Sequence, residues 1–326
     1  MNKISDVTFP GSETSFLDKL TRQGRSSNTV KNYKTDLQCF NKYLQEHGNG
    51  LGLSKFTKNE ITGYGHFLDK KYSSDNSKRR RIQTLRMFFD YLVEEGIYPD
   101  NPVRSLPSSP KFLDIPRPTP FIDIKTLWEY LLKEETSEDD MIKLLAIRNQ
   151  IVLLLIFSSG LKVSEISKLK KSAIITTEQK NASRIMISSG KRDPYSIPIA
   201  NVFNLVLKKY LPLLEEMKKR AGLEFDEILF NANPYQILSG GLSPRGLEIV
   251  FEEFRKKLIL NLTPKSLRQS CIFKWIHQRK KDSLIREWMG VSPSYSLKLY
   301  RDHSSSHPYN EEFLEEMYLH FDRKKS

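Results

Sequence analysis

Cysteine is scarce in this sequence: Cys39 and Cys271 are the only two, and they lie far apart. Two distant cysteines cannot supply the disulfide framework of a small secreted domain. Each lies within an apolar helical pattern, so we interpret both as buried thiols of a protein from a reducing compartment. No grouping of cysteine, histidine and carboxylate residues has the spacing of metal ligands, and we expect neither a metal nor a cofactor.

Long apolar runs and an apolar leader are also missing. The longest apolar run, Ile151 to Phe157, is far shorter than the roughly 20 residues that span a bilayer. Residues 1–13, MNKISDVTFPGSE, have no apolar centre, which argues against a signal peptide. We therefore predict a cytoplasmic protein without a membrane partner.

Negative charge is in the minority, because 52 lysines and arginines face 39 aspartates and glutamates, a formal net charge of +13. The excess is spread along the chain: residues 1–110 hold 17 basic and 12 acidic residues, a net of +5, which leaves +8 for the remainder. A basic surface favours a polyanionic partner, nucleic acid before an anionic membrane. A generally basic soluble protein is the alternative that charge alone leaves open.

Residues 13–105 have the pattern of a helical domain, preceded by a polar and loose segment at 1–12. Apolar residues recur at helical spacing from Val30 to Leu44 and again from Ile82 to Leu92, the latter in a helix starting near Ser77. Further helices are predicted near 15–24 and 58–70. Cationic side chains gather at the starts of two helices, and we interpret them as ligands of DNA phosphates, with a solvated face as the alternative. They are Lys31 and Lys34 on one helix and Lys78, Arg79, Arg80, Arg81 and Arg86 on the other.

Proline marks the boundary that follows, because six of the sixteen prolines lie between Pro102 and Pro120. Residues 106–120 are therefore predicted to be an extended linker to a second domain, 121–326. In that domain we predict helices near 124–133, 141–157, 201–220, 243–258 and 310–321. Alternating residues predict a β-hairpin with strands near 184–187 and 195–199 and a turn at 190–194. Arg245, at the start of one helix, is a further candidate DNA ligand.

The stretch from Leu262 to Tyr300 carries the densest chemistry. Thr263 and Pro264 form a typical helix start, an N-cap hydroxyl followed by proline at the first helical position. Leu267, Cys271, Trp275 and Ile276 recur at helical spacing and should form the buried stripe. On another face, Lys265, Arg268 and Gln269 share a surface near the helix N-terminus. Because that terminus already favours anions, such a surface suits a phosphate.

This stretch resembles the C-terminal half of the tyrosine recombinases, most closely the Xer and phage-integrase type. That family carries a Thr-Pro-His-x-Leu-Arg-His helix, then Leu-Gly-His, then a nucleophilic tyrosine. The matching stretches here are Thr263 to Gln269, Met289-Gly290-Val291, and Tyr300. Upstream, Gly160-Leu161-Lys162-Val163-Ser164-Glu165 resembles the family's Gly-Leu-Arg-x-Ser-Glu motif. The resemblance extends over about 15–322.

The resemblance implies that a tyrosine oxygen attacks a DNA phosphodiester without metal or ATP and forms a 3′-phosphotyrosyl bond, which a 5′-hydroxyl can later reseal. Such a reaction needs cations for the extra charge on phosphorus, a general acid for the leaving oxygen, and a base. By motif, Tyr300 is the nucleophile, Arg268 the bidentate phosphate clamp and Lys191 the general acid.

Several family identities are replaced. Lys162 stands for the first arginine, and a point-charge ammonium lacks the forked donors of a guanidinium. Lys265 stands for the histidine, a change that the related type IB topoisomerases and telomere resolvases tolerate. Gln269 replaces a second histidine, which we interpret as a minor change, and Val291 removes a donor before the nucleophile.

We predict a mainly α-helical, two-domain clamp around double-stranded DNA, with a small β-hairpin. The expected function is site-specific recombination or integration, slow or dependent on a second subunit that docks through the C-terminal helix. One alternative is a catalytically impaired, DNA-binding accessory relative of a recombinase. Another, suggested by Lys265, is an activity like that of a type IB topoisomerase.

Overall fold

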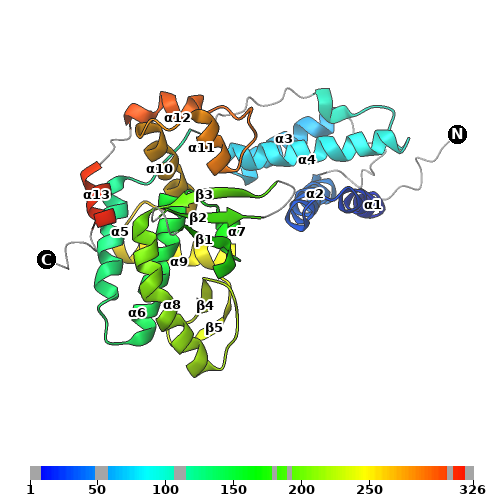
Figure 1. The fold of residues 1–326 in the computed structure, drawn as a ribbon. Coiled ribbons are helices and arrows are strands. Elements are labelled where there is room, and N and C mark those ends of the chain that lie inside the picture. Colours follow the sequence, from blue (N-terminus) through cyan, green and yellow to red (C-terminus); the bar gives the residue numbers. More distant parts are fainter. Residues whose placement is uncertain are drawn as a thin grey trace. The chain divides into compact units, whose positions relative to one another are not determined.

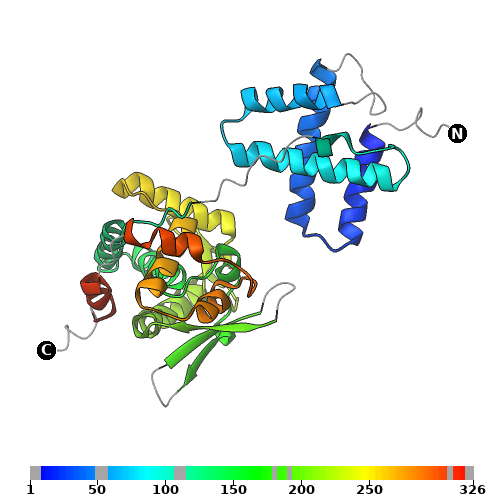
Figure 2. The same cartoon turned by 90° about the horizontal axis from the view of Figure 1, so that it is seen from above.

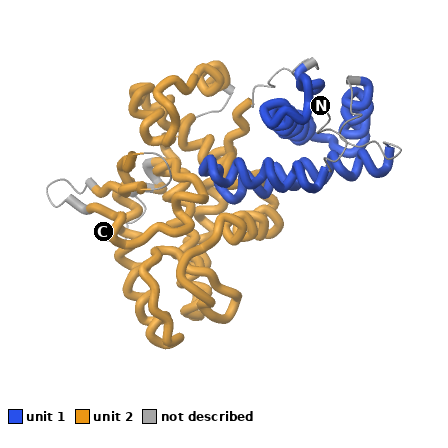
Figure 3. The backbone as a smooth tube through the Cα atoms, turned by 90° about the vertical axis from the view of Figure 1, so that its right-hand side faces the viewer, with its two compact units in different colours: residues 1–111 blue, residues 112–326 orange. Residues whose placement is uncertain are grey.

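The structure is a computed structural model that describes residues 9–47, 58–105, 115–177, 182–188, 193–306 and 311–319. The chain divides into two compact units, 1–111 and 112–326 (Figure 3). Residues 106–114, most of the segment predicted as a linker, lie outside the described residues. Residues 115–120 belong to the second unit.

Unit 1 is helical. Its α-helices are α1 (Phe9–Arg22), α2 (Ser27–His47), α3 (Lys58–Lys71) and α4 (Asp75–Glu94), followed by a 3-10 turn, η2 (Pro102–Ser105). Helix α4 lies across α2 (Figure 2). Aromatic rings fill the space between these helices, as with Phe40 and Tyr64, whose centroids are 5.1 Å apart. The predicted helices are present, although α1 begins at Phe9 rather than near Ser15.

Unit 2 is larger and mixes helices with two small sheets (Figure 1). Its helices are α5 (Phe121–Glu134), α6 (Asp140–Leu153), η3 (Leu154–Ser158), α7 (Val163–Ile166), η4 (Lys171–Ala173), α8 (Asn201–Ala221), α9 (Pro244–Leu258), α10 (Pro264–His277), α11 (Asp282–Met289), α12 (Lys298–Asp302), η5 (Ser304–Ser306) and α13 (Glu311–Leu319). Helices α10, α11 and α12 gather at one end of the unit, and the β4–β5 ribbon described below lies at the other (Figure 1).

The predicted hairpin is confirmed as β2 (Ala182–Ile187) and β3 (Tyr195–Ile199), which pair antiparallel with Ile185 opposite Ile197. A third strand, β1 (Ile174–Thr177), pairs with β2 on its other side, and a separate ribbon joins β4 (Phe230–Ala232) to β5 (Ile237–Gly240). These three strands were not predicted, because runs of three or four residues are too short to show alternation. Of the predicted turn at 190–194, residues 190–192 lie outside the described part of the chain.

Helix α6 continues into the π-helical turn η3, and together they form the centre of the unit 2 core. The stretch Asp140–Ser158 is long and apolar enough to cross a membrane, with a mean hydropathy of 1.8, but it is 78% buried inside the unit. The prediction of a buried helix at 141–157 is therefore confirmed. A helix that is apolar all round suits such a central position.

Helix α10 is held against the end of η3 by two of its side chains. Lys274 Nζ donates to the carbonyl oxygens of Phe157 (3.2 Å) and Ser158 (2.9 Å), and Cys271 Sγ also lies 3.6 Å from the Ser158 oxygen. The predicted stripe on α10 is buried, but so are Ile272 and Phe273 on other sides of the helix. Because η3 and neighbouring helices surround it, α10 holds its exposed N-terminal side chains in a fixed position.

Candidate active site

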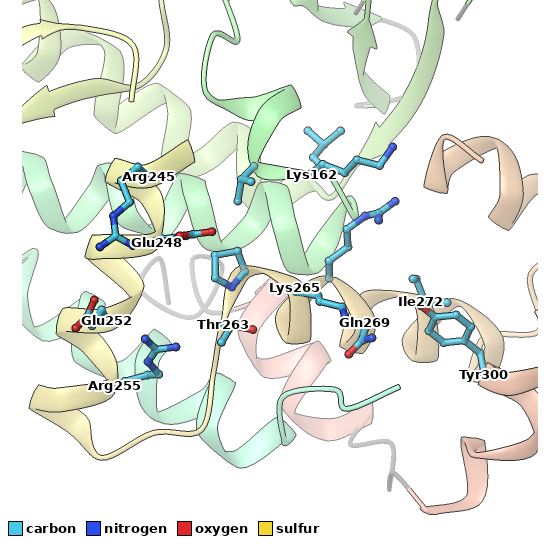
Figure 4. A pocket seen from close by; sticks show the side chains of 14 residues that line it. Lys162, Arg245, Glu248, Glu252, Arg255, Thr263, Lys265, Gln269, Ile272 and Tyr300 are labelled. Atoms are coloured by element: carbon cyan, nitrogen blue, oxygen red, sulfur yellow. Dashed lines mark hydrogen bonds and ion pairs between the residues drawn. The ribbon is translucent and has the colours of Figure 1, made fainter. Parts of the chain in front are cut away.

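Four of the five residues predicted to carry the chemistry, Lys162, Lys265, Arg268 and Tyr300, line one pocket of unit 2, with a volume of about 390 Å³ (Figure 4). Helix α10 runs along its floor, Tyr300 lies at one end, and α9 lines the opposite end (Figure 4). The pocket is lined by Leu161, Lys162, Val163, Arg245, Glu248, Glu252, Arg255, Thr263, Pro264, Lys265, Arg268, Gln269, Ile272 and Tyr300.

The N-terminus of α10 is fixed as the sequence predicted. Thr263 Oγ1 accepts the backbone N–H of Ser266 at 3.0 Å, and Ser266 Oγ accepts that of Thr263 at 2.7 Å. This reciprocal cap sets the direction of the first helical turn. Lys265 is exposed in that turn and lines the pocket, so its charge faces a terminus that already favours anions.

Arg268 is anchored by two backbone carbonyls from distant segments. Its Nε donates to the oxygen of Gly160 at 2.6 Å, and its Nη2 donates to the oxygen of Met289 at 2.5 Å. A guanidinium has five N–H donors, so these contacts leave others to face the pocket. Arg268 therefore connects its own motif on α10 to the Gly160–Glu165 motif and to the Met289–Val291 motif.

Gly160 makes this anchoring possible through its own backbone. Its φ of +68° is one that residues with a side chain rarely adopt. A Cβ added there would lie 2.5 Å from Cη2 of Trp275 on α10. Only glycine therefore allows α10 to approach closely enough for Arg268 to reach the Gly160 carbonyl.

Lys162 lines the pocket but is also held by its neighbours. Its Nζ lies 3.3 Å from Glu165 Oε1 and 3.4 Å from the Gly290 oxygen, and its side chain is 37% exposed. Glu165 is itself buried and accepts the backbone N–H of Lys162 (2.7 Å) and the hydroxyl of Tyr195 (2.8 Å). Glu165 is thus the carboxylate that orients the lysine, a role that the sequence motif by itself did not reveal.

Tyr300, on α12, is only 8% exposed, and its ring packs 5.6 Å from that of Phe273. Burial raises the pKa of its phenol to about 12. The phenol of Tyr295 acts in the same direction, whereas the charge of Arg268 and the amide of Gln269 oppose the rise in pKa. The phenol is therefore protonated at neutral pH, within reach of groups that stabilise its anion.

Two further predicted site residues differ in what the structure shows of them. Lys191, the predicted general acid, lies outside the described residues. Arg245 is on the rim of the pocket and lies 3.4 Å from Glu248. Sequence reasoning missed Glu248, Glu252 and Arg255, although their spacing on α9 places them on one helical face with Arg245.

In unit 1 the predicted phosphate ligands differ in their surroundings. Lys31 and Lys34 are exposed and Arg79 is partly exposed, and none of them makes a hydrogen bond or ion pair within the described part of the chain. By contrast, Lys78 Nζ lies 2.9 Å from carboxylate oxygens of both Asp69 and Asp75.

The two arginines that follow Arg79 are linked to a buried carboxylate. Asp36 accepts from Arg80 Nη2 at 2.7 Å, and Arg81 Nε lies 3.8 Å from the same oxygen. Arg81 is buried and stacks 3.8 Å from the ring centroid of Tyr72. Arg86 donates to the Val103 oxygen at 3.4 Å. Their contribution to DNA contact stays a prediction, and each also serves the internal packing of unit 1.

Known proteins match both units. Residues 14–96 match the family model of the phage integrase N-terminal SAM-like domain. The chain is 26% identical to the tyrosine recombinase XerC of Chlamydia muridarum, over 90% of this chain and 97% of that protein. It is 24% identical to the tyrosine recombinase XerD of Listeria innocua, over 86% and 90% respectively. Over most of its length, the chain is therefore similar to the tyrosine recombinases.

Solved structures of tyrosine recombinases and integrases share the fold. A lambda integrase dimer bound to a COC′ core site aligns with a TM-score of 0.67 at 17% identity, covering 94% of this chain and 80% of that one. XerH in a post-cleavage complex with a palindromic difH substrate also aligns with a TM-score of 0.67, at 16% identity, covering 99% and 89%. The mainly helical fold with small antiparallel sheets, predicted from the sequence, is confirmed by these two likenesses.

Proposed function

We propose that this protein is a site-specific DNA recombinase that cuts and rejoins strands through a covalent bond to Tyr300. The observation that carries the proposal is the single pocket in which Tyr300 meets Arg268, Lys162 and Lys265. The three cationic side chains can bind a DNA phosphodiester, and the buried phenol that lines the same pocket can serve as the nucleophile. The names of the full-length relatives support the same reaction class.

In the proposed reaction, the scissile phosphate enters the pocket beside the N-terminus of α10. The free N–H groups of Arg268 bind its non-bridging oxygens, and the ammonium groups of Lys162 and Lys265 add positive charge. As Tyr300 loses its proton, its oxygen attacks phosphorus, the 3′-phosphotyrosyl ester forms, and the 5′-oxygen leaves. Lys191 is proposed to give that oxygen its proton.

The same site favours a slow or partner-dependent enzyme. Tyr300 is buried and its pKa is raised to about 12, so little phenolate is present at neutral pH. Lys162 supplies one point charge where a forked donor would bind two oxygens. We propose that DNA and a second subunit complete the site, and that the protein acts on double-stranded DNA in the cytoplasm.

Covalent capture tests the proposal. Duplexes are first selected from a random library by binding to the Tyr300→Phe protein, and are then nicked so that cleavage releases a short fragment and cannot reverse. The native protein should form an adduct that resists denaturation, and Tyr300→Phe should form none while binding equally well, because it lacks only the attacking oxygen. A peptide map should locate the adduct on Tyr300.

A second candidate function is an accessory DNA-binding protein without chemistry of its own. The ion pair that draws Lys162 towards Glu165 favours it, because this pair competes with the phosphate for the same ammonium. Absence of adduct from both the native and the Lys162→Arg proteins, on duplexes that both bind, would support the accessory role and refute the proposed reaction.

A further inference from the structure

The segment 115–120, which leads into unit 2, lies along the N-terminal half of α10. We call it the strap. The backbone N–H of Thr119 donates to the Ser266 oxygen at 3.2 Å, and their hydroxyls are 2.8 Å apart. Ser270 Oγ donates to the Thr119 oxygen at 2.8 Å. The backbone N–H of Arg117 donates to Gln269 Oε1 at 3.0 Å. The strap therefore contacts the helix that carries the phosphate clamp through both backbone and side chains.

Gln269 connects this strap to the nucleophile. Its side chain is only 9% exposed and lines the pocket that also holds Tyr300. A carboxamide has an oxygen that accepts and a nitrogen that donates. Because the Arg117 N–H requires an acceptor, the oxygen of Gln269 must face the strap. Its Nε2 then faces away from the strap, into the pocket that Tyr300 also lines (Figure 4).

We propose that Gln269 is a positioning residue for the nucleophile: its amide nitrogen donates to the Tyr300 oxygen, and the Arg117 backbone N–H fixes that orientation. The inference rests on the proposed function of Tyr300 and deepens it. It gives the end of the linker a direct influence on the reactivity of the nucleophile. A change in the strap that releases Arg117 releases Gln269, and Tyr300 loses a donor.

The physical effect is on the ionisation of Tyr300. A hydrogen bond donated to the phenol oxygen stabilises the phenolate more than the phenol, so it lowers the pKa. Burial and Tyr295 act against it, and Arg268 acts with it. Gln269 itself neither gains nor loses a proton. The other ionisable groups that line the pocket are Lys162, Lys265, and the α9 residues Arg245, Glu248, Glu252 and Arg255.

The first test measures the phenol directly, without any DNA. A fluorotyrosine is incorporated at position 300, so that the phenol titrates at a lower pH, and its fluorine resonance is followed against pH. Gln269→Met keeps the size of the side chain but removes both the donor and the acceptor. The pKa should rise by roughly one pH unit, the effect of one hydrogen bond to a charged group. Gln269→His, which again has one donor and one acceptor, should restore most of the difference.

The second test addresses the strap with a matched pair of variants. Arg117→Pro removes the backbone N–H in a segment already flanked by Pro116 and Pro118, whereas Arg117→Ala keeps that N–H and removes only an exposed side chain. Arg117→Pro should raise the fluorotyrosine pKa as Gln269→Met does, and Arg117→Ala should leave it unchanged. Equal pKa values in both strap variants would overturn the role of the Arg117 N–H.

The adduct assay then separates this inference from the proposed function. With Gln269→Met, the rate of adduct formation at neutral pH should fall about tenfold, and its pH profile should move to higher pH. An uncharged, merely structural residue would lower the rate without moving the profile. If the native protein forms adduct and the Gln269→Met profile and fluorotyrosine pKa are unchanged, the inference is wrong and the function stands. If no native adduct forms, the function is wrong, whatever the titration shows.

Discussion

At Lys162 this chain carries an ammonium at the position where the tyrosine recombinases that it resembles carry a guanidinium. The lysine is held 3.3 Å from Glu165, so its single charge is shared between that carboxylate and the pocket. An arginine has enough N–H groups to keep the contact with Glu165 and to direct a forked pair at a phosphate. Lysine at position 162 therefore stabilises the negative charge that develops on the phosphate less than an arginine would.

We expect Lys162→Arg to raise the rate of adduct formation by about tenfold to hundredfold, since one further preorganised donor acts where charge develops. Binding affinity should change little, because the exposed cations elsewhere supply most of it. Single-turnover kinetics on a nicked duplex measure the rate, and Lys162→Met, which removes the charge, is the control and should slow it. A rate that arginine leaves unchanged would show that this position does not limit the chemistry.

The raised pKa of Tyr300 predicts the direction of the pH dependence. The phenol pKa is about 12, so at neutral pH the folded protein holds the phenol almost fully protonated. Each rise of one pH unit then increases the phenolate fraction about tenfold, as long as the pH stays below that pKa. The rate of adduct formation should climb across the neutral to mildly alkaline range. A flat profile under single-turnover conditions would mean that a step other than loss of the phenol proton limits the rate.

At the scale of elements, the contact between α10 and the end of η3 depends on Gly160. Alanine there would hold a strained positive φ and place its methyl against Trp275. We expect Gly160→Ala to lower the free energy of unfolding by about 2–5 kcal/mol, as the sum of backbone strain and overpacking. Urea titration of the full chain measures this loss.

Gly222 provides a matched control for Gly160. It has a similar φ of +65° at the end of α8, but nothing lies within 4 Å of an added Cβ. Gly222→Ala should therefore cost only the backbone term, about 1–2 kcal/mol. If both alanine variants lose the same free energy of unfolding, the ring of Trp275 moves away without cost. Gly160 is then not required for the close approach of α10.

The basic residues at the starts of α2 and α4 also form a testable surface. Lys31, Lys34 and Arg79 have no hydrogen bond or ion pair within the described part of unit 1, so their charges are available to phosphates. Changing all three to alanine should weaken DNA binding of any sequence and lower the salt dependence by about one counterion for each lost contact.

Lys78 is the matched control for that surface, because two aspartates already neutralise it. Lys78→Ala should change the slope of affinity against salt concentration by less than a single alanine substitution of Lys31, Lys34 or Arg79 does. Fluorescence anisotropy across a range of salt concentrations measures the slopes. A triple variant with the native slope would assign Lys31, Lys34 and Arg79 to a solvated face.

At the scale of the whole molecule, we predict that the C-terminal helix decides between a monomer and an assembly. The apolar face predicted to dock on a neighbour is buried in the chain's own unit, where Phe313, Leu314 and Met317 pack on α5 and α8. Docking on another subunit therefore requires α13 to leave a surface that it already covers.

We expect deletion of 308–326 to abolish cooperative assembly on DNA and also to destabilise the monomer, because the surface under α13 becomes exposed to water. Met317→Ala should reproduce the destabilisation alone, by about 2–5 kcal/mol, whereas Glu312→Ala on the exposed side of α13 should be nearly neutral. Sedimentation with DNA and thermal unfolding measure the two effects. Unchanged cooperativity in the deletion variant would exclude α13 from the assembly.

The sequence predicted long elements better than short ones. Periodicity over α2 and α4 was visible because each presents several turns, and α6 was predicted from its apolar composition. Thr263 with Pro264 marked the start of α10 by local chemistry alone. The strands β1, β4 and β5 are too short to show a period. The predicted site residues of α10, with Lys162 and Tyr300, were found through motif spacing, and the structure places them in one pocket.

The sequence by itself determined which residues are candidates for the chemistry, because a phenol, a guanidinium and several ammonium groups are properties of side chains and their order. Only the tertiary structure decided what each of them faces. The Asp36 carboxylate that holds Arg80 is 44 residues away from it, and the N–H that orients Gln269 lies 152 residues upstream. Ionisation of Tyr300 likewise depends on burial by segments distant in the chain. Such contacts arise when packed elements meet, so no local pattern of residues encodes them.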